Sequence, residues 1–241
     1  MRLIKYISDL HIERKIKPII FKKKQLGGNL FIAGDIGSPL EDSYWKFLKY
    51  ASNNFDNIYF TTGNHEYWNK KKYTIDNIND IINDKSINYN NLHFLNNSMV
   101  STDDYDIIGS TLWSNPLYNL KKSIDFRMIY YSNNNKLTPK TMKKLHNKSV
   151  TKINKLIKQN DKPKIILTHY LPSYQFTIQN PYWKPSYSIY ASELDHMIKY
   201  PVVAWIFGHT HDRFIRDVNG VKCCVNALGY KNKVEIDEIN I

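Results

Sequence analysis

Short apolar runs alternate with helical patterns along much of the chain, and this alternation is typical of an α/β protein. The apolar runs predict strands at residues 3–7, 30–33, 58–61, 92–95, 99–101, 107–110, 165–167, 202–207, 214–218, 221–225 and 234–239. Asn219-Gly220 separates two of these runs and favours a tight hairpin turn. Because the chain has no internal repeat and no clear linker, we expect a single domain over residues 1–241.

Apolar residues at helical spacing predict helices at residues 38–53, 70–83, 138–157 and 191–199. The first is expected to have Ser38 as its N-cap, Pro39 at its first helical position and Glu41 closing a capping box. The longest begins at Thr138-Pro139, which is also a helix-start signal. Residues 173–188 lack such a pattern and are expected to form an irregular loop rich in aromatic side chains.

Composition is that of a globular protein, with 42% hydrophobic and 23% charged residues among 241. The 34 Lys and Arg residues exceed the 22 Asp and Glu residues and give a net charge of +12, which a nucleic-acid partner or AT-rich codons would both explain. We favour base composition, because Arg, the better phosphate ligand, is scarce. The Lys runs at 22–24, 70–72 and 143–144 are interpreted as solvated faces, and 70–72 lies nearest in sequence to a candidate site.

The cysteines and the N-terminus bear on the compartment. Cys223 and Cys224 are neighbours in a predicted strand, so their side chains should point to opposite faces and are poorly placed to form a disulfide. The first residues resemble neither a signal peptide nor a transit sequence, and no window approaches the roughly 20 apolar residues of a membrane span. We therefore expect a reducing, cytoplasmic location and no membrane partner.

Metal-binding residue types follow five of the predicted strands, as Asp9 and His11, Gly34-Asp35, Gly63-Asn64-His65-Glu66, His169, and Gly208-His209 with His211. Residues two apart in an extended segment project to the same side, so Asp9 and His11 are expected to share one cavity. His209 and His211 have the same spacing. Since parallel strands end at one edge of a sheet, these blocks are expected to meet there.

Two aspartates, one asparagine and four histidines are enough ligands for two cations. A mixed oxygen and nitrogen set suits Mn, Fe, Zn or Co better than Ca. Each block alone is an ordinary cap or turn, but five in one chain, each after an apolar run, indicate a metal site.

The order of the blocks, Asp9-x-His11, Gly34-Asp35, Gly63 to Glu66, His169 and Gly208-His209-x-His211, resembles the calcineurin-like metallophosphoesterase superfamily over nearly the whole chain. Further stretches resemble its small stand-alone members, namely residues 109–113, 125–127 and 226–230. The resemblance implies a four-layer α/β/β/α sandwich. It also implies two divalent metal ions, with Mn expected first and Fe, Zn, Co, Ni or Mg as alternatives.

The resemblance also implies roles for individual residues. The first metal would be held by Asp9, His11 and His211, and the second by Asn64, His169 and His209. Asp35 would bridge both metals, and His65 matches a histidine that contacts the phosphoryl group and acts as general acid. A water between the two metals would become the hydroxide that attacks phosphorus. For Glu66, an orienting role beside His65 or a ligand and a surface ion pair are equally open.

The substrate is less well indicated. Protein phosphatases of this superfamily carry arginines where this chain has residues 36–39 and 61–62, so that activity is disfavoured. Arg127 is a candidate phosphate contact, with a surface ion pair as the alternative. Tyr170, Trp113 and the aromatic loop at 174–187 are candidate walls for a nucleobase, with core packing or a packed lid as the alternative.

These observations predict a dinuclear metal-dependent phosphohydrolase, a phosphodiesterase or phosphomonoesterase, acting on a small nucleotide-type phosphoester. The net charge of +12 motivates a second hypothesis, a nuclease acting on single-stranded or structured nucleic acid. A non-catalytic scaffold is a third hypothesis, which the full set of seven ligands disfavours. The sequence does not indicate an oligomeric state.

Overall fold

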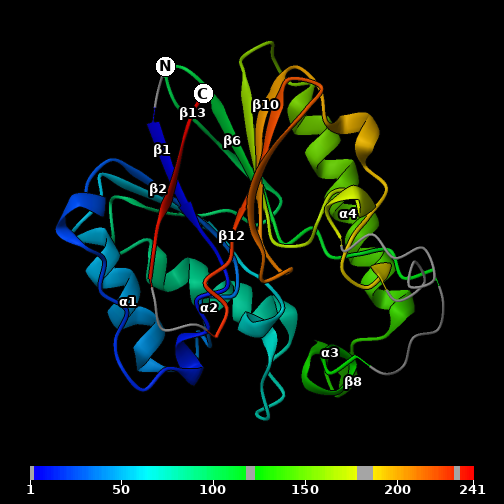
Figure 1. Cartoon of the computed structure of the whole chain (residues 1–241). Coiled ribbons are helices and arrows are strands. Elements are labelled where there is room, and N and C mark those ends of the chain that lie inside the picture. The colour runs from blue at the N-terminus through cyan, green and yellow to red at the C-terminus, as the bar shows by residue number, and fades with distance from the viewer. Residues whose placement is uncertain (1–2, 118–122, 178–186, 231–233) are drawn as a thin grey trace.

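The computed structural model describes residues 3–117, 123–177, 187–230 and 234–241, and two β-sheets dominate it (Figure 1). The first sheet has the strand order β13 (Asp237–Asn240), β1 (Leu3–Ile7), β2 (Asn29–Ala33), β3 (Asn57–Thr61) and β4 (Leu92–Phe94). The second has the order β11 (Arg213–Val218), β12 (Val221–Asn226), β10 (Val202–Phe207), β9 (Lys164–Thr168), β6 (Asp106–Ser110) and β5 (Ser98–Ser101). A small hairpin consists of β7 (Tyr130–Ser132) and β8 (Asn135–Lys136).

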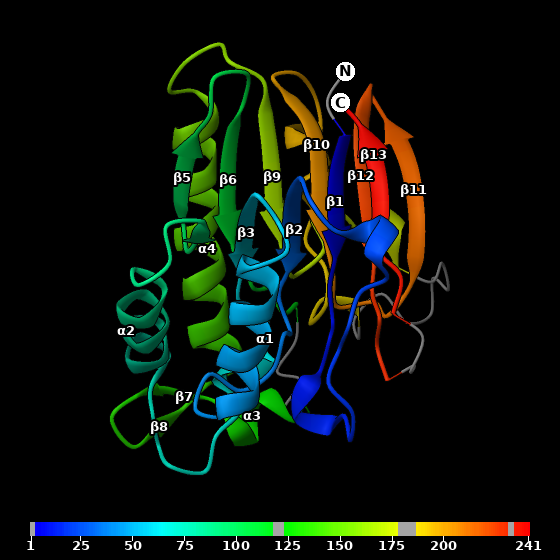
Figure 2. The same ribbon diagram turned by 90° about the vertical axis from the view of Figure 1, so that its left-hand side faces the viewer.

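The two sheets pack face to face, and helices cover their outer faces. One apolar cluster lies between the sheets and includes Ile4 and Phe31 from the first sheet with Ile165 and Ile206 from the second. Helices α1 (Asp42–Ser52) and α2 (Ile75–Ser86) contact the first sheet, and α4 (Pro139–Ile157) contacts the second (Figure 2). The predicted α/β/β/α sandwich is therefore confirmed.

Strand β12 shows how the alternation of side chains divides the two cores. Cys223 belongs to the apolar cluster beneath the helices, and Cys224 belongs to the cluster between the sheets. Both thiols are buried and free, as their adjacent positions predict. Asn219 and Gly220 both have positive φ, at 54° and 79°, and join β11 to β12 in the predicted hairpin.

The strands agree closely with their predicted ranges, but three helices differ. Helix α1 begins at Asp42 rather than at residue 38, because the segment before it closes a turn in which the N–H of Glu41 donates to the carbonyl of Ser38. Helix α2 begins at Ile75, with Thr74 as its N-cap, because the exposed lysines before it have no apolar face to bury. The helix predicted at residues 191–199 is wrong, since only the short 3₁₀ turn Asp195–Met197 forms there.

The topology brings the carboxyl ends of several strands together. Strands β1, β2 and β3 are mutually parallel, as are β6, β9, β10 and β12. A parallel bridge between Ser8 and Ala227 joins the two sheets just beyond the ends of β1 and β12. Each predicted ligand block follows one of these strand ends, so the fold delivers all five blocks to one edge. In the described part of the chain, no helix combines the length and the apolar character that a membrane crossing needs.

Candidate metal centre

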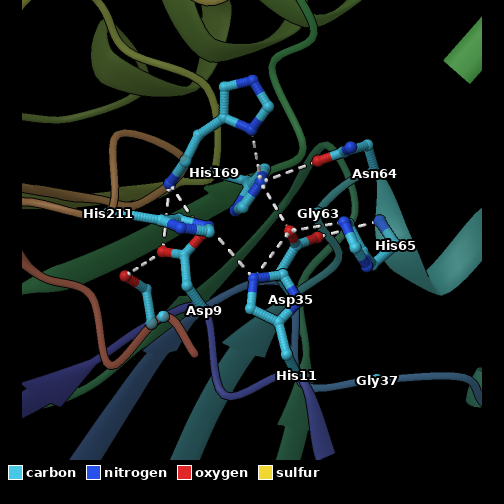
Figure 3. Close-up of polar contacts among 12 residues, drawn as sticks. Asp9, His11, Asp35, Gly37, Gly63, Asn64, His65, His169 and His211 are labelled. Carbon is cyan, nitrogen blue, oxygen red and sulfur yellow. Dashed lines mark hydrogen bonds and ion pairs between the residues drawn. The ribbon is translucent and has the colours of Figure 1, made fainter. Parts of the chain in front are cut away.

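The seven predicted ligands lie together at the carboxyl edge of the two sheets (Figure 3). Asp9, His11 and His211 form one group, whose ligand atoms all lie within 4.8 Å of one another. A second group meets the same criterion and consists of Asp35, His169 and His209. The Oδ1 atom of Asn64 lies 3.1 Å from Nε2 of His169 and so joins the second group.

Asp35 lies between the two groups. Its Oδ2 atom is 3.5 Å from Nε2 of His169, in the second group, and 3.8 Å from Nε2 of His11, in the first. The same oxygen is 3.9 Å from Nε2 of His65. One carboxylate oxygen thus faces ligands of both groups, which is the position that a bridging ligand needs.

The backbone at the ligands is not extended, so the sequence-based argument for their pairing is wrong in its premise. Five of the seven ligands have left-handed backbone, with φ values of 54°, 46°, 53°, 73° and 56° at Asp9, His11, Asp35, His209 and His211. Such conformations are costly for residues with a Cβ atom and concentrate at functional sites. As a result His209 and His211 turn toward different groups, although both reach the same cavity.

Two glycines permit the close approach of these loops. A Cβ atom at Gly63 would lie 2.2 Å from Oδ1 of Asp35, and one at Gly208 would lie 2.7 Å from Oδ2 of Asp9. Real Cβ atoms essentially never come within 3.0 Å of such neighbours. Any larger residue at either position would therefore push a ligand out of place.

The donor chemistry of the histidines fits divalent cations. Nε2 of His11 lies 3.1 Å from Nε2 of His211, and Nε2 of His169 lies 3.1 Å from Nδ1 of His209, so in each pair at least one nitrogen presents a lone pair. The buried Nε2 of His209 has no hydrogen-bond partner among the described residues. Burial lowers the pKa of His169 to about 4 and that of His209 well below its usual value, which keeps both rings in the neutral form that binds metals.

The carboxylates point to the same conclusion. Burial raises the pKa of Asp35 well above its usual value, and the nearby carboxylates of Glu66 and Asp9 raise it further. Within the described residues, no Lys or Arg forms an ion pair with any of these three side chains. A cation between the two ligand groups would offset this buried negative charge.

Other contacts fix the ligands in orientation. Nδ1 of His169 donates to the carbonyl of Ala33 at 2.8 Å, so that Nε2 faces the cavity. Nδ2 of Asn64 donates to Oδ1 of Asp125 at 2.9 Å, which leaves Oδ1 of Asn64 turned toward His169. Supporting hydrogen bonds of this kind are usual behind metal ligands.

Glu66 proves to be a brace between two loops. It is fully buried, and its carboxylate accepts hydrogen bonds from the backbone N–H groups of Asp35, Ile36 and Gly63, at 3.1, 2.6 and 2.7 Å. The surface ion pair considered from the sequence is therefore wrong. The carboxylate ties the loop that carries Asp35 to the loop that carries Asn64 and His65.

The side chain of His65 has two partners that the sequence did not reveal. Its Nδ1 atom lies 3.0 Å from Oε1 of Glu13, and its ring stacks on Trp68 with a centroid distance of 3.7 Å. Burial alone would raise the pKa of Glu13, but the rings of His11 and His65 outweigh it and hold the pKa at about 2. Glu13 is therefore ionised and accepts from Nδ1–H, so that Nε2 of His65 faces Asp35.

These partners differ in how far the sequence could have revealed them. Trp68 follows His65 by three residues in a helical turn, which is a spacing that brings side chains together. Glu13 lies in a different loop and carries no comparable signal.

A cavity of about 670 Å³ opens onto the centre, and Trp68, Tyr190 and Tyr230 contribute aromatic rings to its walls. Arg127 and Tyr170, the candidate substrate contacts, do not line it. Arg127 is exposed on α3 (Asp125–Met128), and Tyr170 is fully buried against the ring of His209 at 4.4 Å.

The other candidate walls lie in the core or beyond the described residues. Trp113 is buried, as its core interpretation requires. Of the aromatic loop, Tyr174–Phe176 forms a 3₁₀ turn with Phe176 buried, and residues 178–186 lie outside the described residues.

The chain resembles several known proteins. The calcineurin-like phosphoesterase family model matches residues 3–213. Uncharacterized protein L509 of Acanthamoeba polyphaga mimivirus is 34% identical over 262 aligned positions, which cover 97% of this chain and 93% of that protein. The phosphopantetheinyl hydrolase of Mycobacterium tuberculosis shares the fold, with a TM-score of 0.72 and 15% identity over 98% of this chain and 95% of that chain. The chain thus belongs to the calcineurin-like phosphoesterase family and is a metal-dependent phosphoester hydrolase.

Proposed function

We propose that this protein hydrolyses a small nucleotide-type phosphoester at a centre of two divalent cations. The observation that carries the proposal is the place of Asp35, one of whose oxygens faces both groups of ligands. In this proposal Asp9, His11 and His211 hold one cation. The other is held by Asn64, His169 and His209, and Asp35 is shared. When bound, two such cations offset charge on the phosphoryl oxygens and acidify water.

His65 is proposed to act on the substrate directly and Glu13 to position it. With Nδ1–H donated to Glu13, the ring of His65 is held with Nε2 toward the cavity. From there it can hold a proton for the departing oxygen of the ester. Stacking on Trp68 limits rotation of the ring, and the carboxylate of Glu13 stabilises the ring when it is protonated.

The shape of the cavity favours a small substrate. Its volume of about 670 Å³ lies within the range usual for small-molecule sites. Tyr190 and Tyr230 are 41% and 55% exposed, so their rings are accessible for stacking with a base. Of the described residues that line this cavity, none is Lys or Arg, which disfavours a track for a nucleic-acid strand here.

The direct test is turnover of bis-p-nitrophenyl phosphate and p-nitrophenyl phosphate by protein loaded with Mn, alongside metal analysis. We expect close to two metal ions per chain and metal-dependent turnover of at least one substrate. His65→Gln should lower kcat with the metal content unchanged, and His93→Gln, which alters a histidine that contacts Asn57 away from the centre, serves as the matched control. Turnover that does not depend on metal, or none with either substrate, would argue against the proposal.

The nuclease hypothesis makes a different prediction. A nuclease would cleave labelled oligonucleotides faster than the small esters, and its binding would weaken steeply with salt. We expect neither behaviour.

A further inference from the structure

A second cavity, of about 590 Å³, adjoins the one at the metal centre. Tyr230 lines both cavities, and the metal-ligand candidate His11 also lines the second. The remaining walls come mostly from the loop that follows β1, between residues 14 and 22. A substrate held at the centre can therefore extend past the ring of Tyr230 into this second space.

The two cavities differ sharply in charge. The described residues lining the first include neither Lys nor Arg. The second is lined by Arg14, Lys15, Lys17 and Lys22, and none of its described lining residues is Asp or Glu. Charge on the reacting phosphate is met at the centre itself, so the positive charge of the second cavity is available for another anionic group.

Arg14 is held in place at the boundary between the cavities. Its guanidinium carbon lies 5.0 Å from the ring centroid of Tyr230 and 5.9 Å from that of Trp68. The nearest carboxylate in an ion pair with it is Glu13, at 3.9 Å from Nε. By contrast, the guanidinium of Arg213 binds both Glu235 and Asp237. Arg14 thus keeps its charge for a ligand and is oriented before one arrives.

The apolar walls strengthen this preference. Ile16 and Ile20, which are 100% and 68% exposed, line the second cavity beside the lysines. Apolar groups lower the local dielectric and so strengthen attraction between the cations and an anion. Arginine also binds phosphate with two parallel hydrogen bonds, which a single ammonium cannot do.

We propose that this second cavity, defined by Arg14, Lys15, Lys17, Lys22 and Tyr230, is a subsite for a second phosphate on the substrate. The substrate class is a phosphoester whose retained portion carries a further phosphate, such as a nucleoside bisphosphate ester. This inference rests on the proposed function and deepens it. Arg14 is the principal determinant, because its side chain lies nearest to the shared ring of Tyr230.

The test compares two substrates that differ by one phosphate, thymidine 5′-(p-nitrophenyl phosphate) and its 3′-phosphorylated form. For the wild-type protein we expect kcat/KM to be at least about tenfold higher with the 3′-phosphate, mainly through KM, as one charge-assisted hydrogen bond would give. Arg14→Met should bring this ratio close to one. Lys85→Met, which removes a lysine that packs on Trp45 of α1, should keep it.

A binding measurement separates this inference from the proposed function. By calorimetry, thymidine 3′,5′-bisphosphate should bind the wild-type protein at least about tenfold more tightly than thymidine 5′-phosphate, and Arg14→Met should bind both equally. Absence of all turnover would count against the proposed function, with the binding ratio still deciding on the subsite. Equal binding and equal kcat/KM for the members of each pair would overturn the subsite alone.

The second phosphate could belong to a small molecule or to a nucleic-acid strand, and a third substrate distinguishes them. In the 5′-(p-nitrophenyl phosphate) of a thymidine dinucleotide, the second phosphate is a diester that continues into another nucleoside. Lower kcat/KM than with the 3′-phosphate assigns the subsite to a small bisphosphorylated molecule. Equal or higher kcat/KM assigns it to a strand.

Discussion

Charge is buried at both ends of the parallel strands, but in opposite ways. At the amino ends, Lys164 begins β9 and Asp106 begins β6, and both are fully buried. The ammonium donates to Oδ2 of Asp106 at 3.0 Å, to Oδ1 of Asn160 at 2.5 Å and to the carbonyl of Lys162 at 2.6 Å. Asp106 also accepts from Ser101 at 2.6 Å. Both ions are therefore paired and saturated with hydrogen bonds.

At the carboxyl ends the buried charge is of one sign and has no such compensation from the protein. Asp9, Asp35 and Glu66 lie close together, and burial raises the pKa of Glu66 to about 7 although backbone N–H groups lower it. The backbone at the ligands is also left-handed. The comparison teaches that one end contributes to stability by itself, whereas the other reduces stability until cations bind.

The largest expected effect comes from the bridging position. Asp35→Asn should lower kcat/KM by roughly 10³-fold or more, as expected when a catalytic group is removed. The same substitution should leave the metal-free protein as stable as the wild type or more stable, because one of three buried carboxylates becomes neutral. Steady-state kinetics and urea unfolding without metal provide the two measurements.

Two results would break this part of the comparison. One is a metal-free Asp35→Asn protein clearly less stable than the wild type. The other is a similar loss of activity in the control Asp217→Asn, which alters an exposed aspartate that pairs with Lys222.

The opposite end should respond in the reverse manner. Lys164→Met leaves Asp106 buried without its cation and should reduce the free energy of unfolding by about 3–5 kcal/mol. The kcat of the folded protein should not change. As a matched control, Lys222→Met breaks an exposed ion pair and should cost less than about 1 kcal/mol. Similar losses in the two variants, measured by urea unfolding, would show that the buried pair has no special weight.

A smaller effect is expected at Glu13, which sharpens the contrast between binding and positioning. Glu13→Gln should lower kcat by about 10- to 100-fold with little change in KM, because the ring of His65 loses its charged partner. In ¹⁵N NMR spectra, Nδ1 of His65 should lose the signature of a proton donated to a carboxylate. A purely structural role for Glu13 would leave the His65 spectrum unchanged.

The smallest effect concerns pH. Burial alone would raise the pKa of Asp106, but hydrogen bonds from Ser101, Lys164 and Asn160 outweigh it and hold the pKa below its usual value. Asp106 therefore stabilises the fold at pH values above its unfolded pKa of about 4, and this contribution is lost as the pH falls through its lower folded pKa. Below pH 4 the unfolding temperature of the wild type should fall more steeply than that of Asp106→Asn. Parallel curves would contradict this assignment.

Much of the fold could be predicted because the information is local. The strands are short apolar runs whose ends are marked by the ligand blocks, so β1 and β10 have their predicted bounds. The start of α1 could not be predicted in this way. Ser38-Pro39 satisfies the local helix-start rules, but the chain turns once more before Asp42 and the helix is set by how Tyr44 and Leu48 pack on the sheet.

The site divides along the same line. The order of the blocks indicates the seven ligands, because each follows its own strand. Glu13, Trp68 and Arg14 were missed because their roles arise where loops from different strands meet in space. The left-handed backbone at the ligands is equally invisible to a rule that assumes extended chain.

The brace formed by Glu66 has a consequence for the timing of order. Because one carboxylate holds the backbone of both the Asp35 loop and the Gly63 loop, these loops reach their final conformation when the chain folds. The conformational entropy of arranging Asp35 and Asn64 is thus lost during folding rather than at the moment when a cation is captured. The affinity of the centre for metal then reflects the ligand atoms themselves, since their placement is already complete.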